Sequence, residues 1–207
     1  MILEACVENL EEALNSEKKG ASQIELCDRL DLDGLTPSIE TIEAVIRKVD
    51  IPVKVIINPV AFQYHYSTTR IEEILSLLKV INKYPLAGIV FGPLTKDGLP
   101  DLKLIRRVSD HTDLPITFHK AIDQTKNILE NTEAIAKQGI VKYILSSGGA
   151  STAEEGSGTL LKMKSLLADT STRLIAAGKV TNTNLSHLHK RLGLEYYHGR
   201  KIVGSLS

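Results

Sequence analysis

Two short apolar segments of the sequence each place a glutamate two residues before a cysteine. Glu4 precedes Cys6 in ILEACVE, Glu25 precedes Cys27 in QIELCDRL, and these two cysteines are the only ones in the chain. Residues two apart in a β-strand lie on the same face, so each segment would present a carboxylate and a thiol together. Thiolates are ligands for soft ions such as Cu(I), and carboxylates serve as general acids or bases.

The elements that must position these residues follow from an alternating pattern. Short β-rich segments recur along the chain with amphipathic segments between them, which predicts strands alternating with helices. The expected strands are residues 2–6, 22–27, 52–58, 86–92, 115–121, 141–147, 172–178 and 194–199, and the expected helical segments are 7–20, 38–49, 68–84, 101–110, 126–139, 152–169 and 182–193.

Eight strand–helix repeats predict an α/β fold of the TIM (β/α)₈ barrel type, with residues 1–207 as a single domain. A doubly wound open sheet is the alternative, but no G-x-G-x-x-G turn follows the first expected strand. Soon after the last expected strand the sequence ends, and KIVGSLS leaves too little for a full eighth helix. We therefore expect the eighth helix to be short or missing.

In such barrels the active site lies at the carboxyl ends of the strands. The sequence places Glu4, Glu25 and His119 there, and this trio is a candidate for acid–base catalysis. Structural interpretations stay open, because a single cysteine is often a small buried hydrophobe and each glutamate could form an ion pair. The basic residues considered for such pairs are Lys54, Lys120 and Arg200.

Other polar residues at strand ends are candidates for holding an anion or a cofactor. The segments SSGGAST and AAGKVTNTN join strands to helices and offer free backbone N–H groups, although ordinary turn chemistry explains them equally well. The candidate ligand-binding residues are Asn58, Lys120, Gly148, Gly149, Gly178 and His198, with Thr117, Ser146 and Ser147 as neighbours.

The amino-acid composition limits the kinds of binding partner that are expected. Lysine plus arginine and aspartate plus glutamate number 25 each, so the formal net charge is zero and attraction to nucleic acid or an anionic membrane is not expected. The sequence shows no basic-then-apolar leader, no apolar run near 20 residues and only two cysteines, which favours a reducing compartment. We expect a cytoplasmic protein.

Several segments, in order, closely resemble the CutC family, which is named for copper homeostasis. They are LEACVENLEEALNSEKKGASQIELCDRLDLDGLTPS, VFGPLTKDGLPD, TFHKAID, ILSSGGASTAEEG and YYHG, so the resemblance extends from Met1 to about Arg200. It implies a cytoplasmic TIM barrel that binds copper, with Cu(I) held by thiols at the matching positions Cys6 and Cys27. The chain also keeps the family's residues at Glu4, Glu25, Thr117, His119, Asp123 and His198.

Three departures from the family pattern fall at the expected barrel mouth. An R-P-R run is replaced by Asn58-Pro59-Val60, an arginine by Lys120, and a P-G-G-G-like turn by AAGKV. Lysine cannot reproduce the planar fork of arginine, so an anionic ligand would be held differently or more weakly. A metal site at the two cysteines would be unaffected.

The leading hypothesis is therefore a cytoplasmic copper-binding protein of copper homeostasis, with Cu(I) held by Cys6 and Cys27. The alternative is an enzyme in which Glu4, Glu25 and His119 act on a small anionic, for example phosphorylated, metabolite. A homo-oligomer is compatible with either hypothesis, and the sequence carries no motif that decides its state.

Overall fold

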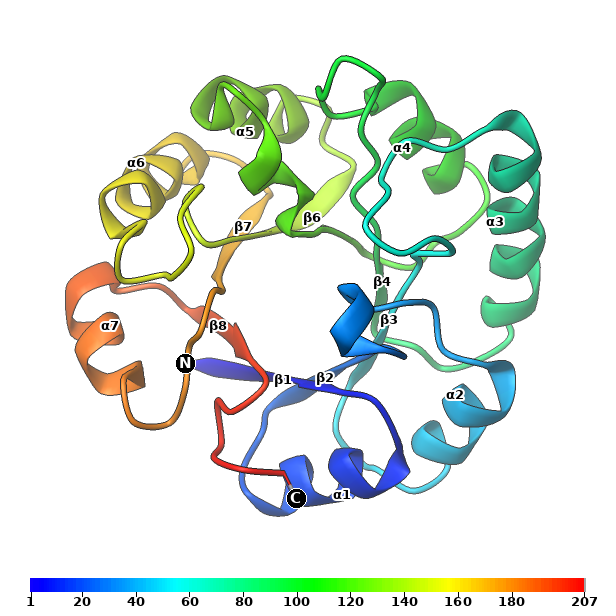
Figure 1. The fold of residues 1–207 in the computed structure, drawn as a ribbon, viewed down its shortest axis with the longest axis horizontal. Coiled ribbons are helices and arrows are strands. Elements are labelled where there is room, and N and C mark those ends of the chain that lie inside the picture. Colours follow the sequence, from blue (N-terminus) through cyan, green and yellow to red (C-terminus); the bar gives the residue numbers. More distant parts are fainter. Residues whose placement is uncertain (207) are drawn as a thin grey trace.

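The computed structural model describes residues 1–206 and shows a closed barrel of eight parallel strands, paired in the order β1 to β8, with helices around it (Figure 1). The prediction of an α/β barrel of the TIM type is confirmed. The strands are β1 Ile2–Val7, β2 Gln23–Leu26, β3 Val53–Ile56, β4 Gly88–Val90, β5 Ile116–Phe118, β6 Val141–Ser146, β7 Arg173–Ala176 and β8 Tyr196–Gly199.

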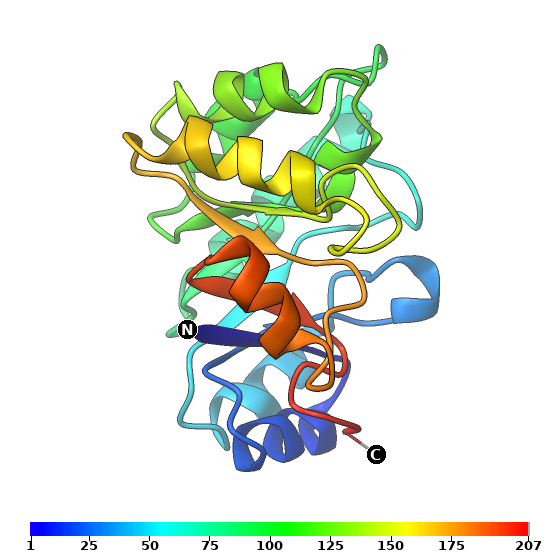
Figure 2. The ribbon, with the colours of Figure 1, turned by 90° about the vertical axis from the view of Figure 1, so that its left-hand side faces the viewer.

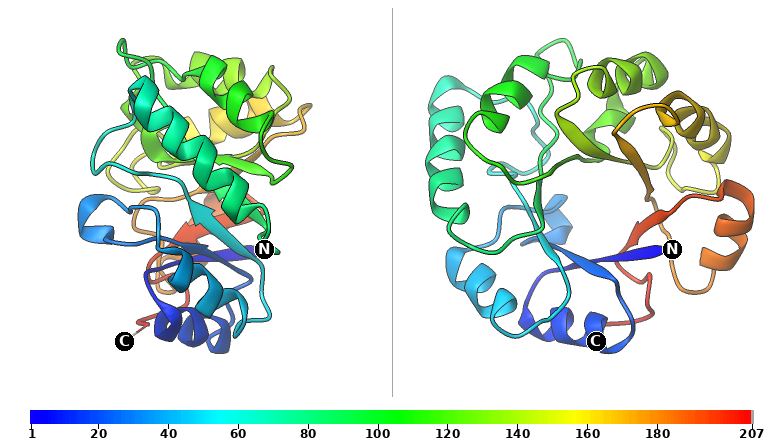
Figure 3. Two further views of the ribbon diagram at one scale, coloured as in Figure 1. Left: turned by 90° about the vertical axis from the view of Figure 1, so that its right-hand side faces the viewer. Right: turned by 180° about the vertical axis from the view of Figure 1, so that it is seen from behind.

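The helices form the outer layer of the barrel and shield its sheet from water, as the view from behind also shows (Figure 3). They are α1 Leu10–Lys18, α2 Ile39–Ile46, α3 Thr68–Ile81, α4 Leu102–Ser109, α5 Ile128–Ala136, α6 Ser157–Leu167 and α7 Leu185–Leu192. Several begin at a side chain that accepts a backbone N–H, as Asn9, Ser38, Ser67 and Asp101 do. Gly193 ends α7 with φ of 55°, a left-handed conformation that favours glycine.

The packing core lies between the sheet and the helices. Ile24, Val55 and Ile89 from successive strands are fully buried, as are Leu78 of α3 and Ile105 of α4. Strands covered on both faces are expected to be apolar throughout, which is why the polar residues of β1, β2 and β3 are exceptions that need another explanation.

The carboxyl ends of the strands meet on one side of the barrel, where two short 3₁₀ helices lie. Figure 2 shows the loop of the first, η1 (Leu30–Leu32), projecting from this mouth on the side away from the N-terminus. The second, η2 (Lys120–Gln124), follows β5 directly. Both therefore place residues at the edge of the barrel interior.

No helix follows β8 among the described residues, which end at Leu206, so the expectation for the eighth helix is met. The last residues instead pack beside α1, where the amide of Asn15 donates a hydrogen bond to the Leu206 carbonyl at 2.9 Å (Figure 1). The barrel closes by pairing β8 with β1, in a register that sets His198 beside Glu4.

None of the helices in residues 1–206 is both long and apolar enough to span a membrane.

Candidate functional site

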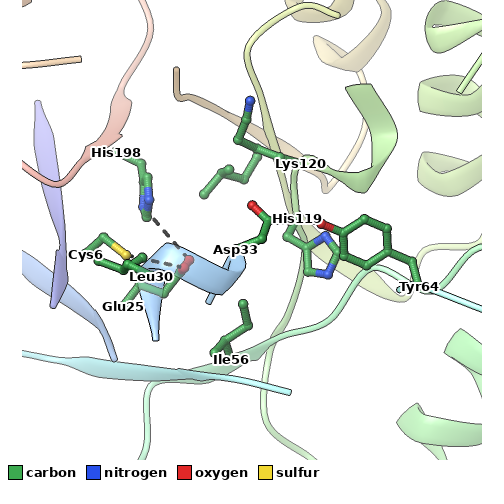
Figure 4. A pocket seen from close by; sticks show the side chains of 10 residues that line it. Cys6, Glu25, Leu30, Asp33, Ile56, Tyr64, His119, Lys120 and His198 are labelled. Carbon is green, nitrogen blue, oxygen red and sulfur yellow. Dashed lines mark hydrogen bonds and ion pairs between the residues drawn. The ribbon is translucent and has the colours of Figure 1, made fainter. Parts of the chain in front are cut away.

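A pocket opens at the carboxyl ends of the strands, over the centre of the barrel (Figure 4). Its volume is about 160 Å³, enough to hold several water molecules. It is lined by Cys6, Glu25, Leu30, Asp33, Ile56, Tyr64, His119, Lys120, Leu145 and His198. The mouth predicted from the strand ends is therefore a real cavity with both polar and apolar walls.

The two cysteines lie together, and one of them, Cys6, lines this pocket. Cys6 and Cys27 are free thiols, both buried, and their Sγ atoms are 3.7 Å apart. The β1–β2 register pairs Cys6 with Glu25, so Cys27, directly after β2, lies two residues further along the chain than the partner of Cys6. The Cys27 thiol also lies 3.4 Å from the Val7 carbonyl.

Glu25 and His198 lie next to the Cys6 thiol. Cys6 Sγ is 4.0 Å from Glu25 Oε1, and His198 Nδ1 is 3.9 Å from Glu25 Oε2 (Figure 4). Cys6, Glu25 and His198 each offer a ligand atom within 4.8 Å of the others, which is close enough for one ion to be shared. The Cys6 thiol, an imidazole and a carboxylate thus converge on one side of the pocket.

The protonation states of Cys6, Glu25 and His198 depend on one another. The hydrogen bond with Cys27 and burial raise the pKa of Cys6 well above its usual value. Burial also raises the pKa of Glu25. Burial alone would lower the pKa of His198, but the charge of Glu25 and contacts with Cys6 and Glu4 outweigh it and raise this pKa. Without a metal, the protein therefore favours a protonated Cys6 thiol and a charged His198.

Glu4 lies deeper than we expected from the sequence, because it is fully buried inside the barrel and does not line the pocket. Its Oε2 is 2.7 Å from Lys54 Nζ, its Oε1 is 2.9 Å from His198 Nδ1, and Gln23 also donates to it. Burial would raise the pKa of Glu4, but Lys54 and His198 together lower it to about 2. Glu4 is a charged anchor for His198, and the ion pair with Lys54 is the structural alternative weighed above.

His119 lies on the pocket wall across from the thiols, beside Tyr64 and Asp33 (Figure 4). Its Nδ1 accepts the Ala121 backbone N–H at 3.1 Å, which leaves the proton of the neutral ring on Nε2. Burial lowers the pKa of His119 to about 4. The ring packs against Tyr64, with centroids 4.9 Å apart, and the Tyr64 hydroxyl donates to Asp33.

Lys120 lines the pocket, and its ammonium group donates to Ser147 Oγ at 2.9 Å. Asp123 lies 3.3 Å from the same ammonium group and accepts the backbone N–H of Ser147 and of Gly149, each at 2.9 Å. An external anion at this turn would have to compete with the Asp123 carboxylate. Anion binding by Lys120 and Gly149 stays a prediction.

The other candidate ligand-binding residues have structural contacts. Gly148 has φ of 73° and donates its N–H to Ser146 Oγ at 2.8 Å, and Gly178 has φ of 98° and accepts from Ala153. Asn58 donates to the Gly34 carbonyl at 2.8 Å and so ties the end of β3 to the η1 loop. None of the three glycines or Asn58 lines the pocket.

Asp33, Tyr64 and Leu30 line the pocket but did not emerge from the sequence as candidates. Asp33 and Tyr64 lie on loops and Leu30 begins η1, so strand periodicity could not find them. The acid-rich DRLDLDG segment after the second strand was the available signal, because loops at the barrel mouth commonly carry site residues.

Comparison with known proteins identifies the family of the chain. The CutC family matches residues 1–203 of the chain. The human protein named copper homeostasis protein cutC homolog is 34% identical over 200 residues, which cover 95% of this chain and 72% of the human one. A family protein CutC of Aliivibrio fischeri is 34% identical over 199 residues, covering 95% and 80%.

Solved structures show the same architecture. CutC from Streptococcus agalactiae superposes with a TM-score of 0.90 at 23% identity, covering 98% of this chain and 99% of that one. Phosphoribosylanthranilate isomerase from Thermotoga maritima gives 0.61 at 11% identity, covering 96% and 87%, so it shares the barrel fold alone. From the family match and the sequence identities, the chain belongs to the CutC family.

Proposed function

We propose that this protein binds copper as Cu(I) in the cytoplasm and takes part in copper homeostasis, with Cys6 and Cys27 as the ligands. The observation that carries the proposal is the distance of 3.7 Å between the Sγ of Cys6, which lines the pocket, and the Sγ of the buried Cys27. The names of the human and mouse relatives, both copper homeostasis protein cutC homolog, support it.

The donor set fits the chemistry of this ion. Thiolates are soft ligands that select Cu(I) over magnesium or calcium, and a cysteine pair kept reduced in the cytosol is available to bind it. The pocket beside the thiols gives an ion and its carrier a route to Cys6, which lines the cavity. Copper is the cargo here, so it must be able both to enter and to leave.

Competition against a Cu(I) chelator under anaerobic, reducing conditions tests this proposal. We expect the reduced protein to bind about one Cu(I) ion, and Cys6→Ser, Cys27→Ser and the double variant to bind much more weakly. The protein should carry no affinity tag, because a histidine tag binds copper itself. Wild-type affinity in the double serine variant would remove the basis of the proposal.

A second candidate, an acid–base enzyme, is favoured by one observation. Glu25, with a raised pKa, and the neutral His119 line the same cavity as Lys120. Groups with shifted pKa values in a pocket are typical of catalytic sites. A substrate would be a small anionic metabolite, and turnover that survives in Cys6→Ser/Cys27→Ser but is lost in His119→Gln would favour the enzyme over copper binding.

A further inference from the structure

The carboxylate of Glu25 is buried with one of its oxygens left unpaired. The residue is only 5% exposed, and no group in residues 1–206 donates a hydrogen bond to its Oε2. His198 Nδ1 lies 3.9 Å from this oxygen, which is beyond hydrogen-bond distance. A buried polar atom without a partner needs an explanation, and an ion bound beside it is one.

Glu25 belongs to a cluster of three potential metal ligands. Cys6, Glu25 and His198 each offer one ligand atom within 4.8 Å of the other two, and all three line the pocket (Figure 4). Cys6 Sγ is 4.0 Å from Glu25 Oε1, and the bond from Nδ1 to Glu4 holds the His198 ring beside the cluster. Ligand atoms bonded to zinc at about 2.0–2.3 Å in a tetrahedron lie roughly 3.3–3.7 Å apart, so closure by about half an ångström would complete the site.

The donor types of this cluster match a divalent ion of the zinc class. Zinc is bound by cysteine sulfur, histidine nitrogen and carboxylate oxygen, and a zinc site that stays open to other molecules has three protein ligands. When the ion replaces the thiol proton, the Cys6 thiolate and the Glu25 carboxylate balance its double charge. Cu(I) is softer and carries a single charge, so the carboxylate contributes little to its binding. Magnesium and calcium prefer oxygen ligands alone.

Cys27 does not belong to this cluster, although its Sγ is 3.7 Å from that of Cys6. The Cys27 side chain is fully buried and does not line the pocket. Its thiol donates to the Val7 carbonyl at 3.4 Å, and this contact satisfies the thiol in its protonated form. A divalent ion at the cluster can therefore bind while Cys27 keeps its proton.

We propose that Cys6, Glu25 and His198 form a binding site for a divalent ion of the zinc class, with a ligand set different from the cysteine pair proposed for Cu(I). The inference goes beyond the proposed copper function and does not depend on it. The fourth position of such an ion faces the pocket, which has room for water or a small ligand with an oxygen donor. Because Cys6 belongs to both ligand sets, zinc and Cu(I) exclude each other.

Competition for Zn²⁺ against a chromophoric chelator, with untagged protein under anaerobic conditions, tests the ligand set. We expect the wild type to bind about one ion, and Cys6→Ser, Glu25→Gln and His198→Gln each to bind it at least about tenfold more weakly. Cys27→Ser should keep most of the Zn²⁺ affinity although it loses Cu(I) binding. His111→Gln is the matched control for His198→Gln and should equal the wild type, because His111 is exposed and does not line the pocket. Equal affinities in wild type, Glu25→Gln and His198→Gln would overturn the inference.

Two measurements on the wild-type protein keep the test independent of variant folding. X-ray absorption at the zinc edge should show a single sulfur together with nitrogen and oxygen ligands. A pair of sulfurs would place Cys27 on the ion and refute the ligand set. In ¹⁵N-labelled protein, adding Zn²⁺ should shift the signal of a ring nitrogen of His198, and unchanged signals from both ring nitrogens would refute its part in the site.

Loading the two metals in turn tests the shared thiol and separates this inference from the copper function. Cu(I) added to the zinc-loaded protein should release about one zinc ion for each copper ion bound. A protein that holds both ions at once would refute the sharing of Cys6. Wild-type protein that binds Cu(I) but no Zn²⁺ would refute the inference and leave the copper function standing, whereas Zn²⁺ binding without Cu(I) binding would support the inference and refute the copper function.

Discussion

Lys54 Nζ lies 2.7 Å from Glu4 Oε2 inside the barrel, where both side chains are buried. The ammonium group also lies 4.1 Å from the centre of the Tyr143 ring. An ion pair in such a place costs desolvation energy on both sides, and its short contact fixes the position of the Glu4 carboxylate. Glu4 also contacts His198, which lines the pocket. The ion pair between Lys54 and Glu4 is therefore connected to the pocket through His198.

We expect Lys54→Met to destabilise the protein by up to about 3–5 kcal/mol, because the buried Glu4 carboxylate then keeps only His198 as a positively charged neighbour. The double variant Glu4→Gln/Lys54→Met should recover much of that loss, since neither charge is then left alone. Urea unfolding of the two single variants and the double variant measures the coupling between the residues. Additive losses in the double variant would mean that the pair does not act as a unit.

His119 should make the protein sensitive to mild acid. Its pKa of about 4 in the folded protein lies below the ordinary value of 6.5, so the unfolded chain binds more protons between these pH values. Stability is therefore fully present above about pH 6.5 and falls as the pH drops towards 4, by up to roughly 3 kcal/mol. His119→Gln should flatten this part of the stability curve measured by urea unfolding from pH 4 to 7, and an unchanged slope would contradict the prediction.

The Cys6 thiol should react slowly in the folded protein. Its hydrogen bond with Cys27 and its burial raise its pKa, and only the thiolate is nucleophilic. We expect iodoacetamide at neutral pH to label Cys6 at least about tenfold more slowly than in urea-unfolded protein. Mass spectrometry of peptides over time measures the rate, and labelling at the unfolded rate would show that the thiol is neither shielded nor protonated.

Gly92 should be intolerant of a side chain because it lies against His119. A Cβ built at this position would come within 2.6 Å of His119 Nδ1, the atom that accepts the Ala121 N–H. Gly92→Ala should therefore destabilise the protein by about 1–3 kcal/mol and displace the His119 ring. Gly158→Ala is the matched control, because nothing lies within 4 Å of a Cβ there and α6 should gain up to about 1 kcal/mol. In thermal unfolding, the midpoint temperature should fall for Gly92→Ala and rise for Gly158→Ala.

The amino-acid sequence by itself determined the architecture and the identity of the thiol pair. Eight apolar β-rich segments alternating with amphipathic ones specify a parallel barrel, because each such repeat can bury its apolar surface only against its neighbours. The period of two also placed Glu4 with Cys6 and Glu25 with Cys27 on common faces. The period-two pattern does not show how far each side chain lies from the barrel mouth. Residues two apart share a face but lie in different layers of the barrel.

Tertiary structure decided which of these side chains meet. Cys6 and Cys27 are offset by two residues in the β1–β2 register, yet their sulfurs lie 3.7 Å apart in the folded chain. Glu4 meets His198 because closing the barrel pairs β1 with β8 across most of the chain length, and Lys54 reaches Glu4 from β3. Contacts set by closure and by loops depend on the packing of the whole chain, and no local periodicity encodes them.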